Sequence, residues 1–98
     1  MAAIGSPQIP NTATKANVSG AASSTTLLAA NVGRLGAAIW NDSSAILYVD
    51  LTGGTASATS CSVKLAADDY LEVPFGYTGL ITGIWASATG AARVTEFS

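Results

Sequence analysis

Charged residues are scarce in this chain. Asp, Glu, Lys and Arg make up 10% of its 98 residues, whereas they make up about 25% of a typical soluble domain. The apolar content of 49% is ordinary for such a domain. A monomer of this size normally stays soluble through a surface of mixed charge. The scarcity of charge therefore favours a protein that works packed against copies of itself or within a larger assembly.

Histidine is absent, and cysteine occurs once, as Cys61. A Ser-His-Asp triad, a Cys/His zinc site and an intrachain disulfide are thereby excluded, and Cys61 is expected to pack as a small apolar residue. The closest approach to a metal site is the acidic group Asp68, Asp69 and Glu72. We interpret this group as a solvated turn, because it lacks the alternating oxygen ligands of a calcium loop. We expect no enzyme activity, no cofactor and no bound metal.

Basic residues and long apolar runs are also lacking. The chain has four basic and six acidic residues, with a net charge of −2, so it has no basic face for nucleic acid. No apolar run approaches the ~20 residues that span a bilayer, which argues against a membrane protein. Residues 1–7 have neither the charged region nor the apolar region of a secretory signal. We therefore expect synthesis in a reducing cytoplasm.

Short β-type runs separated by turn clusters begin at about residue 24. Their side chains alternate with a period of two, as a pleated strand requires, and the clearest run is 45–51. This pattern predicts an all-β fold, a small antiparallel sandwich or barrel of about seven strands. The seven runs are 24–30, 35–40, 45–51, 60–65, 70–73, 79–86 and 92–97.

The first part of the chain has a different character. It contains Pro7 and Pro10 and little apolar periodicity, which disfavours both a helix and a central strand. We therefore divide the chain into an extended N-terminal arm over residues 1–23 and a β-sandwich domain over 24–98. Residues 1–20 are expected to be dispensable for folding and needed for attachment to a partner.

The runs 45–51 and 79–86 are apolar on both faces. Ile46 and Tyr48 alternate with Leu47 and Val49. A sheet with one solvated face should show polar residues there, so we expect one face to meet the core and the other a neighbouring subunit. The two arginines, Arg34 and Arg93, are expected to form ion pairs across strands or between subunits. Their expected partners are Asp42, Asp50 and Glu96. The interface candidates are Ile46, Tyr48, Ile81, Trp85, Arg34 and Arg93.

The seven aromatic residues are expected to be core or interface anchors. Sugar binding by an exposed aromatic ring is the alternative, and Trp40, Trp85 and the tyrosines are its candidates.

Three segments carry a resemblance to a known group of proteins. They are residues 34–48 (RLGAAIWNDSSAILY), 70–75 (YLEVPF) and 79–96 (GLITGIWASATGAARVTE). Together they resemble short virion structural proteins of tailed bacteriophages, in which R-G-x-x-I-x-N-D-S-x-A-x-L-Y is followed by Y-x-E-x-P and by a closing G-I-W-x-x-x-x-G-x-A-R-V-T-E. The similarity covers residues 24–97. It departs from that pattern where Leu35 separates Arg34 from Gly36.

The resemblance implies a non-enzymatic virion part made in the cytoplasm of a host bacterium. The preferred role is a capsid decoration, or cement, protein that stabilises the head shell. The partners would be copies of this chain, as a trimer suited to three-fold sites on the shell, and the major capsid protein, reached by the arm. A neck or tail-fibre module and a receptor- or glycan-binding module are the alternatives.

Overall fold

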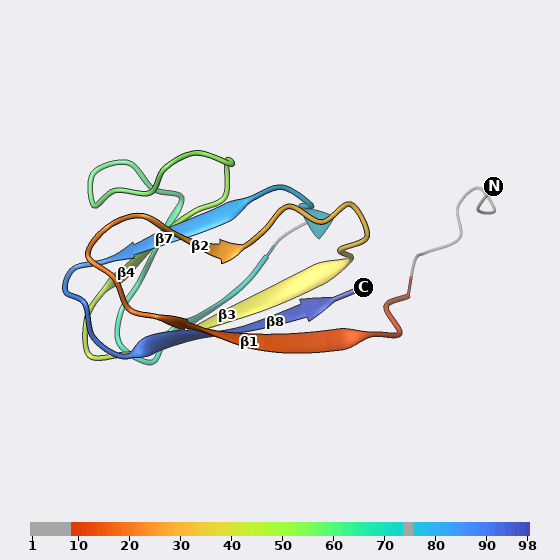
Figure 1. Cartoon of the computed structure of the whole chain (residues 1–98), viewed down its shortest axis with the longest axis horizontal. Coiled ribbons are helices and arrows are strands. Elements are labelled where there is room, and N and C mark those ends of the chain that lie inside the picture. The colour runs from red at the N-terminus through yellow and green to blue at the C-terminus, as the bar shows by residue number, and fades with distance from the viewer. Residues whose placement is uncertain (1–8, 74–75) are drawn as a thin grey trace.

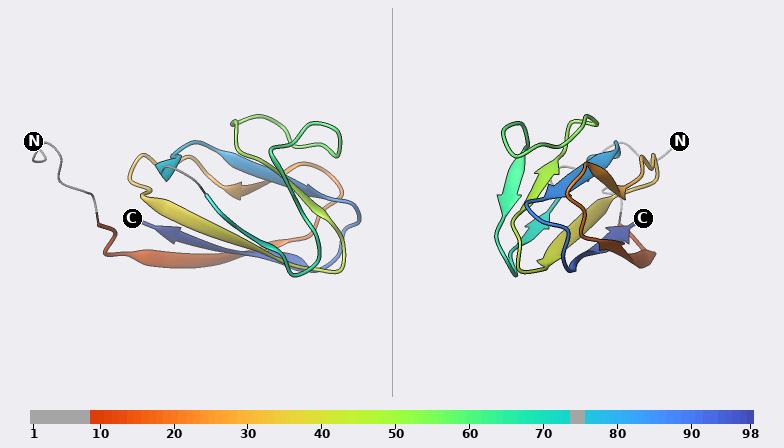
Figure 2. Two further views of the ribbon diagram at one scale, coloured as in Figure 1. Left: turned by 180° about the vertical axis from the view of Figure 1, so that it is seen from behind. Right: turned by 60° about the vertical axis from the view of Figure 1, so that its left-hand side comes forward.

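Eight antiparallel strands form two four-stranded sheets that pack face to face (Figures 1 and 2). This computed structural model describes residues 9–73 and 76–98. The predicted all-β sandwich is confirmed, and the described residues form eight strands where about seven were predicted. No helix among these residues is long and apolar enough to cross a bilayer. The strands are β1 (Ala13–Ser19), β2 (Thr25–Leu28), β3 (Gly36–Asp42), β4 (Leu47–Asp50), β5 (Val63–Leu65), β6 (Tyr70–Glu72), β7 (Ile81–Trp85) and β8 (Ala91–Phe97).

The strands pair in the order of a folded hairpin, the first with the last and so on inward. One sheet runs β1-β8-β3-β6 and the other β2-β7-β4-β5. The pairs β1–β8, β2–β7, β3–β6 and β4–β5 trace one long antiparallel hairpin wound around a common core. The further pairs β3–β8 and β4–β7 complete the two sheets. This winding is that of an eight-strand jelly roll. We name the sheets after their central strands, the β8–β3 sheet and the β7–β4 sheet.

The core lies between these central strands. Ile39 of β3, Leu47 of β4 and Ile81 of β7 are completely buried. Because side chains alternate along a strand, the neighbours of these residues point outward: Trp40 next to Ile39, and Tyr48 next to Leu47. The sandwich therefore has one buried interior and two outer faces that can meet other molecules.

The structure corrects the predicted boundary between arm and domain. Residues 13–19 form β1, an edge strand paired with β8 along its whole length. The pairing extends beyond the strand, from Asn11 N donating to Ser98 O to Gly20 N donating to Gly90 O. Of the β1 side chains, that of Val18 is half-buried and the others are exposed. The first part of the predicted arm, residues 1–8, lies outside the described residues.

Deleting residues 1–20 is therefore expected to destabilise the domain rather than leave it intact. The deletion removes the ladder that pairs β1 with β8, in which each hydrogen bond contributes a net ~0.5–1.5 kcal/mol. We expect the free energy of unfolding to fall by at least ~2 kcal/mol, after allowing for the ordering entropy of the strand. Urea titration followed by circular dichroism measures this. Deletion of residues 1–8 alone is the control, and equal stability of the two truncated chains would contradict a structural role for β1.

Candidate functional site

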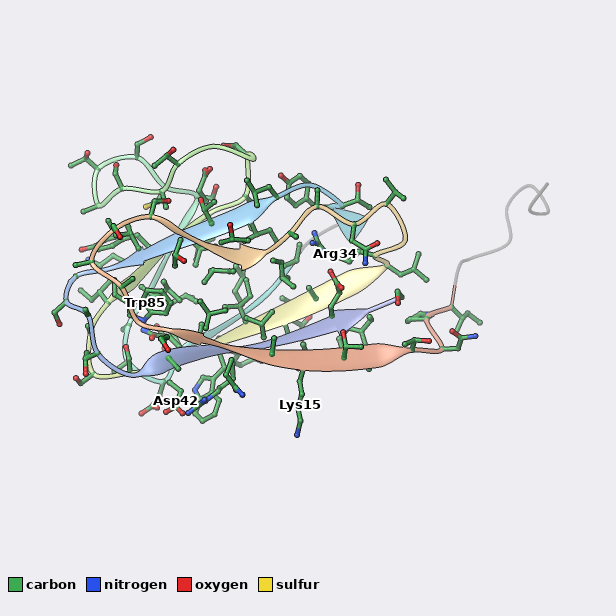
Figure 3. All side chains as sticks on the ribbon, in the orientation of Figure 1. Lys15, Arg34, Asp42 and Trp85 are labelled. Carbon is green, nitrogen blue, oxygen red and sulfur yellow. The ribbon has the colours of Figure 1, made fainter. Side chains whose placement is uncertain are left out.

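Three of the six predicted interface residues lie inside the sandwich. Ile81 and Trp85 point into the core from β7 and are 0% and 1% exposed. Arg34 is 1% exposed. Figure 3 shows Trp85 between the sheets near one end of the sandwich and Arg34 near the other. The assignment of these three residues to a subunit interface is therefore corrected, because a partner could not reach them.

Arg34 instead joins three segments at its end of the sandwich. Its Nε lies 2.8 Å from Glu96 Oε2 of β8, which is one of the three predicted partners. Its terminal nitrogens donate to the carbonyl oxygens of Tyr77 and Gly79, before β7, and of Ala29, just after β2. The planar guanidinium can serve several acceptors at once, which explains how a charged side chain is buried here.

The outer face of the β7–β4 sheet carries a small apolar patch, which we call the Tyr48 face: Ile46, Tyr48, Ala58, Ile84 and Ala86. Tyr48 lies opposite Ile84 in the strand register. Ile46, Tyr48 and Ile84 are all half-buried. A hollow of about 340 Å³ lies on this face, lined by Ala22, Tyr48, Ala58, Ile84, Trp85 and Ala86. Two of the predicted interface residues, Ile46 and Tyr48, thus lie at the surface.

The chain covers part of this outer face by itself. The connection from β4 to β5, residues 51–62, crosses it. The Thr82 hydroxyl donates to Gly54 O at 2.7 Å, and Ala56 N donates to Ser24 Oγ at 3.1 Å. Thr82 and Asp50 are consequently buried although they point outward. The part of this outer face that the connection leaves uncovered is the Tyr48 face, and not the whole sheet as the two-sided apolarity suggested.

The outer face of the β8–β3 sheet has a different chemistry. Trp40 of β3 and Tyr70 of β6 are directly opposite in the register and are 41% and 68% exposed. On its other side Trp40 lies opposite Arg93 of β8. A hollow of about 350 Å³ opens beside the rings. We call this surface the Trp40 face, and its hollow is lined by Ala38, Ile39, Trp40, Asp68, Tyr70, Arg93 and Thr95.

Arg93 is held in place on this face. Its Nε and one terminal nitrogen each lie 2.9 Å from Asp42 Oδ2, and its other terminal nitrogen donates to Asn17 Oδ1 at 3.1 Å. Asp42 is among the predicted partners, and Asn17 comes from β1. An exposed pair of this kind contributes little to stability, but two anchors fix the direction of the guanidinium. Figure 3 shows Asp42 and Lys15 on this outer side of the sandwich.

The turn that carries Asp68 is positioned by Asn41, a residue that the sequence analysis did not single out. Asn41 is fully buried, and its Nδ2 lies within 3.1 Å of the carbonyl oxygens of Ala45, Leu65 and Ala66. Its backbone accepts from Asp68 N and donates to Asp69 O. The turn between β5 and β6 is thereby fastened next to Trp40. Asn41 shares its buried face of β3 with Ala37 and Ile39, and this alternation was the signal available in the sequence.

The acidic group of Asp68, Asp69 and Glu72 and the single cysteine, Cys61, form no metal-binding site among the described residues. Asp69 Oδ2 accepts from Ala66 N at 3.0 Å and so closes the turn. Asp68 has a φ of 67°, a conformation that Asp tolerates in turns. In the described part of the chain, no three Asp, Glu, Cys or His side chains gather into a possible metal site. Cys61 is exposed rather than packed as predicted.

Comparisons with protein-family models, curated proteins and solved structures give no match to this chain. The two outer faces are therefore interpreted from their own chemistry.

Proposed function

We propose that this chain is a non-enzymatic structural subunit of a bacteriophage particle, a capsid decoration protein that works as a homo-oligomer, most simply a trimer. The observation that carries the proposal is the Tyr48 face, an apolar patch on a chain with only 10% charged residues. Copies of the chain would bury this patch against one another. Each copy bound to the shell then stabilises it by mass action.

The arrangement of the chain suits such a role. The jelly-roll order of its strands also occurs in viral capsid domains, in lectins and in cupins, so it is compatible with a virion part without selecting it. The residues before β1 would contact the major capsid protein. Ile9 in that segment is 79% exposed, which leaves an apolar side chain available to a partner.

A neck or tail-fibre module is the second structural candidate, and the number of copies per particle separates the two. Quantitative mass spectrometry of purified virions measures the ratio of this chain to the major capsid protein. A decoration protein is present in numbers comparable with the capsid protein, and a neck or tail protein in a few copies. Absence of the chain from purified particles would overturn both.

Replacing Tyr48 with Asp is expected to dissociate the oligomer. A charge at the centre of a desolvated contact is costly, and loss of a central aromatic anchor weakens association by about thirtyfold or more. Light scattering on the eluting protein should show a multiple of 9.7 kDa for the parent chain and 9.7 kDa for the variant. Tyr70→Asp, on the opposite face, is the matched control and should keep the parent's mass. A parent chain that stays monomeric at high concentration would contradict the proposed assembly.

A further inference from the structure

The Trp40 face combines two exposed aromatic rings with fixed polar groups. Trp40 and Tyr70 are neighbours on adjacent strands, so their positions are set by the sheet and not by a loop. The next row outward holds Ala38 and Thr95, whose small side chains leave the hollow beside the rings. Binding sites are typically concavities of this kind, apolar with a few placed polar groups.

The polar groups around the hollow are preorganised. The Arg93 guanidinium is anchored by Asp42 and Asn17, and the Asp68 carboxylate stands on the turn that Asn41 fastens. When a ligand binds, little conformational entropy is lost in ordering these side chains, which is the advantage of a preformed site. The site thus offers apolar ring faces in the middle and both donors and acceptors at the rim.

The charge around this face limits the class of ligand. Lys15, Asp42, Asp68, Glu72 and Arg93, half of the charged residues of the chain, lie on it or at its edge. Lys, Glu and Asp are depleted at protein interfaces, and four of these five residues are of those types. A second copy of the chain therefore fits the Tyr48 face better than this one. Three acids against two bases also disfavour an anionic ligand.

We propose that the Trp40 face binds a neutral carbohydrate, with one pyranose ring against Trp40 and Tyr70 in the hollow. A pyranose has an apolar C–H face that packs on an aromatic ring and a rim of hydroxyl groups. Those hydroxyls donate to the Asp68 carboxylate and accept from the Arg93 guanidinium. This is a function beyond structural assembly, and it does not depend on which part of a particle the chain occupies.

The test is a binding titration of the full chain with neutral oligosaccharides of glucose, galactose, mannose and N-acetylglucosamine, with uronic-acid oligosaccharides as acidic comparators. The chain has two tryptophans, of which Trp85 is buried and Trp40 is partly exposed, so a saturable change in tryptophan fluorescence is expected to come from Trp40. We expect at least one neutral sugar to bind and the acidic sugars to bind more weakly. A preference for acidic sugars, or no saturable binding to any neutral sugar, would overturn the proposal.

Calorimetric titration of variants then assigns the site. Trp40→Ala should weaken binding at least about tenfold through the lost apolar contact, and Asp68→Asn about three- to tenfold through one altered hydrogen bond. Val32→Ala, at an exposed apolar residue in the connection between β2 and β3, is the control and should bind as the parent does. Binding that Trp40→Ala leaves unchanged would move the sugar elsewhere, and loss of self-association in Trp40→Ala would make this face a subunit contact. Either result overturns the site while leaving the proposed virion role open.

Discussion

Replacing Trp85 with Ala is expected to lower the free energy of unfolding by about 3–5 kcal/mol. Trp85 is the largest of the fully buried side chains and is 1% exposed. It lies opposite Leu47 in the strand register, within the central pair of the β7–β4 sheet. Loss of the ring leaves a cavity that the paired strands cannot close. Since small domains have a stability of about 5–15 kcal/mol, this loss is a large fraction of the whole.

The second tryptophan provides a control of the same residue type. Trp40 is 41% exposed on an outer face, so Trp40→Ala should cost no more than about 1 kcal/mol. Urea titration at several protein concentrations measures both variants and separates folding from association, because oligomer stability depends on concentration. Equal losses from the two substitutions would contradict the placement of Trp85 in the core.

Trp85→Phe separates packing from hydrogen bonding. The indole Nε1 is buried and finds no acceptor among the described residues. The substitution therefore removes no protein hydrogen bond. The free energy of unfolding should fall only through the lost packing contacts, and by much less than in Trp85→Ala. A loss equal to that of Trp85→Ala would show that the indole N–H has a partner in solution.

The period of two was sufficient to predict seven of the eight strands, but not β1. An interior strand must contribute apolar side chains to the core, so apolar and polar or small residues alternate along its sequence. An edge strand can be held by backbone hydrogen bonds alone. β1 shows this: Val18 is its half-buried residue, and the rest of its side chains are in solvent. Its sequence therefore looked like that of an arm.

The alternation also left open which face of β7 meets the core. Ile81 and Trp85 are on one side, and Leu80 and Ile84 on the other, and both sets are apolar enough to be buried. The answer depends on how β7 pairs with β2 and β4, which no single segment specifies. The Trp40 face also depends on strand pairing. It could not be predicted from the sequence, because the pairing of Trp40 with Tyr70 joins residues thirty positions apart.

The burial of Arg34 could not be predicted from the sequence. Charged side chains are almost never fully buried unless they are paired, so a surface position was the reasonable expectation. Its burial depends on Glu96 together with carbonyl oxygens from two connections between strands. These acceptors come together only in the folded chain.

Replacing Arg34 with Met is expected to destabilise the domain by about 3–5 kcal/mol, because removal of one partner leaves the other charge of a buried pair uncompensated. The Glu96 side chain is 19% exposed and keeps one further partner, Asn31 Nδ2 at 3.2 Å. The carbonyl oxygens of Tyr77, Gly79 and Ala29 also lose their donor. Arg93→Met is the matched control. Its pair with Asp42 is 45% and 36% exposed, so the cost there should be at most about 1 kcal/mol.

A double substitution tests whether the loss comes from the unpaired acid. In Arg34→Met/Glu96→Gln the carboxylate charge is absent, so the double variant should be more stable than the sum of the two single effects predicts. A coupling of about 1–3 kcal/mol is expected for residues in direct contact. Chemical denaturation of the four proteins of this cycle gives the coupling. Additive effects would mean that Arg34 acts through the carbonyl oxygens of the two connections, and a loss in Arg34→Met no larger than in Arg93→Met would show that this end of the sandwich does not depend on the buried guanidinium.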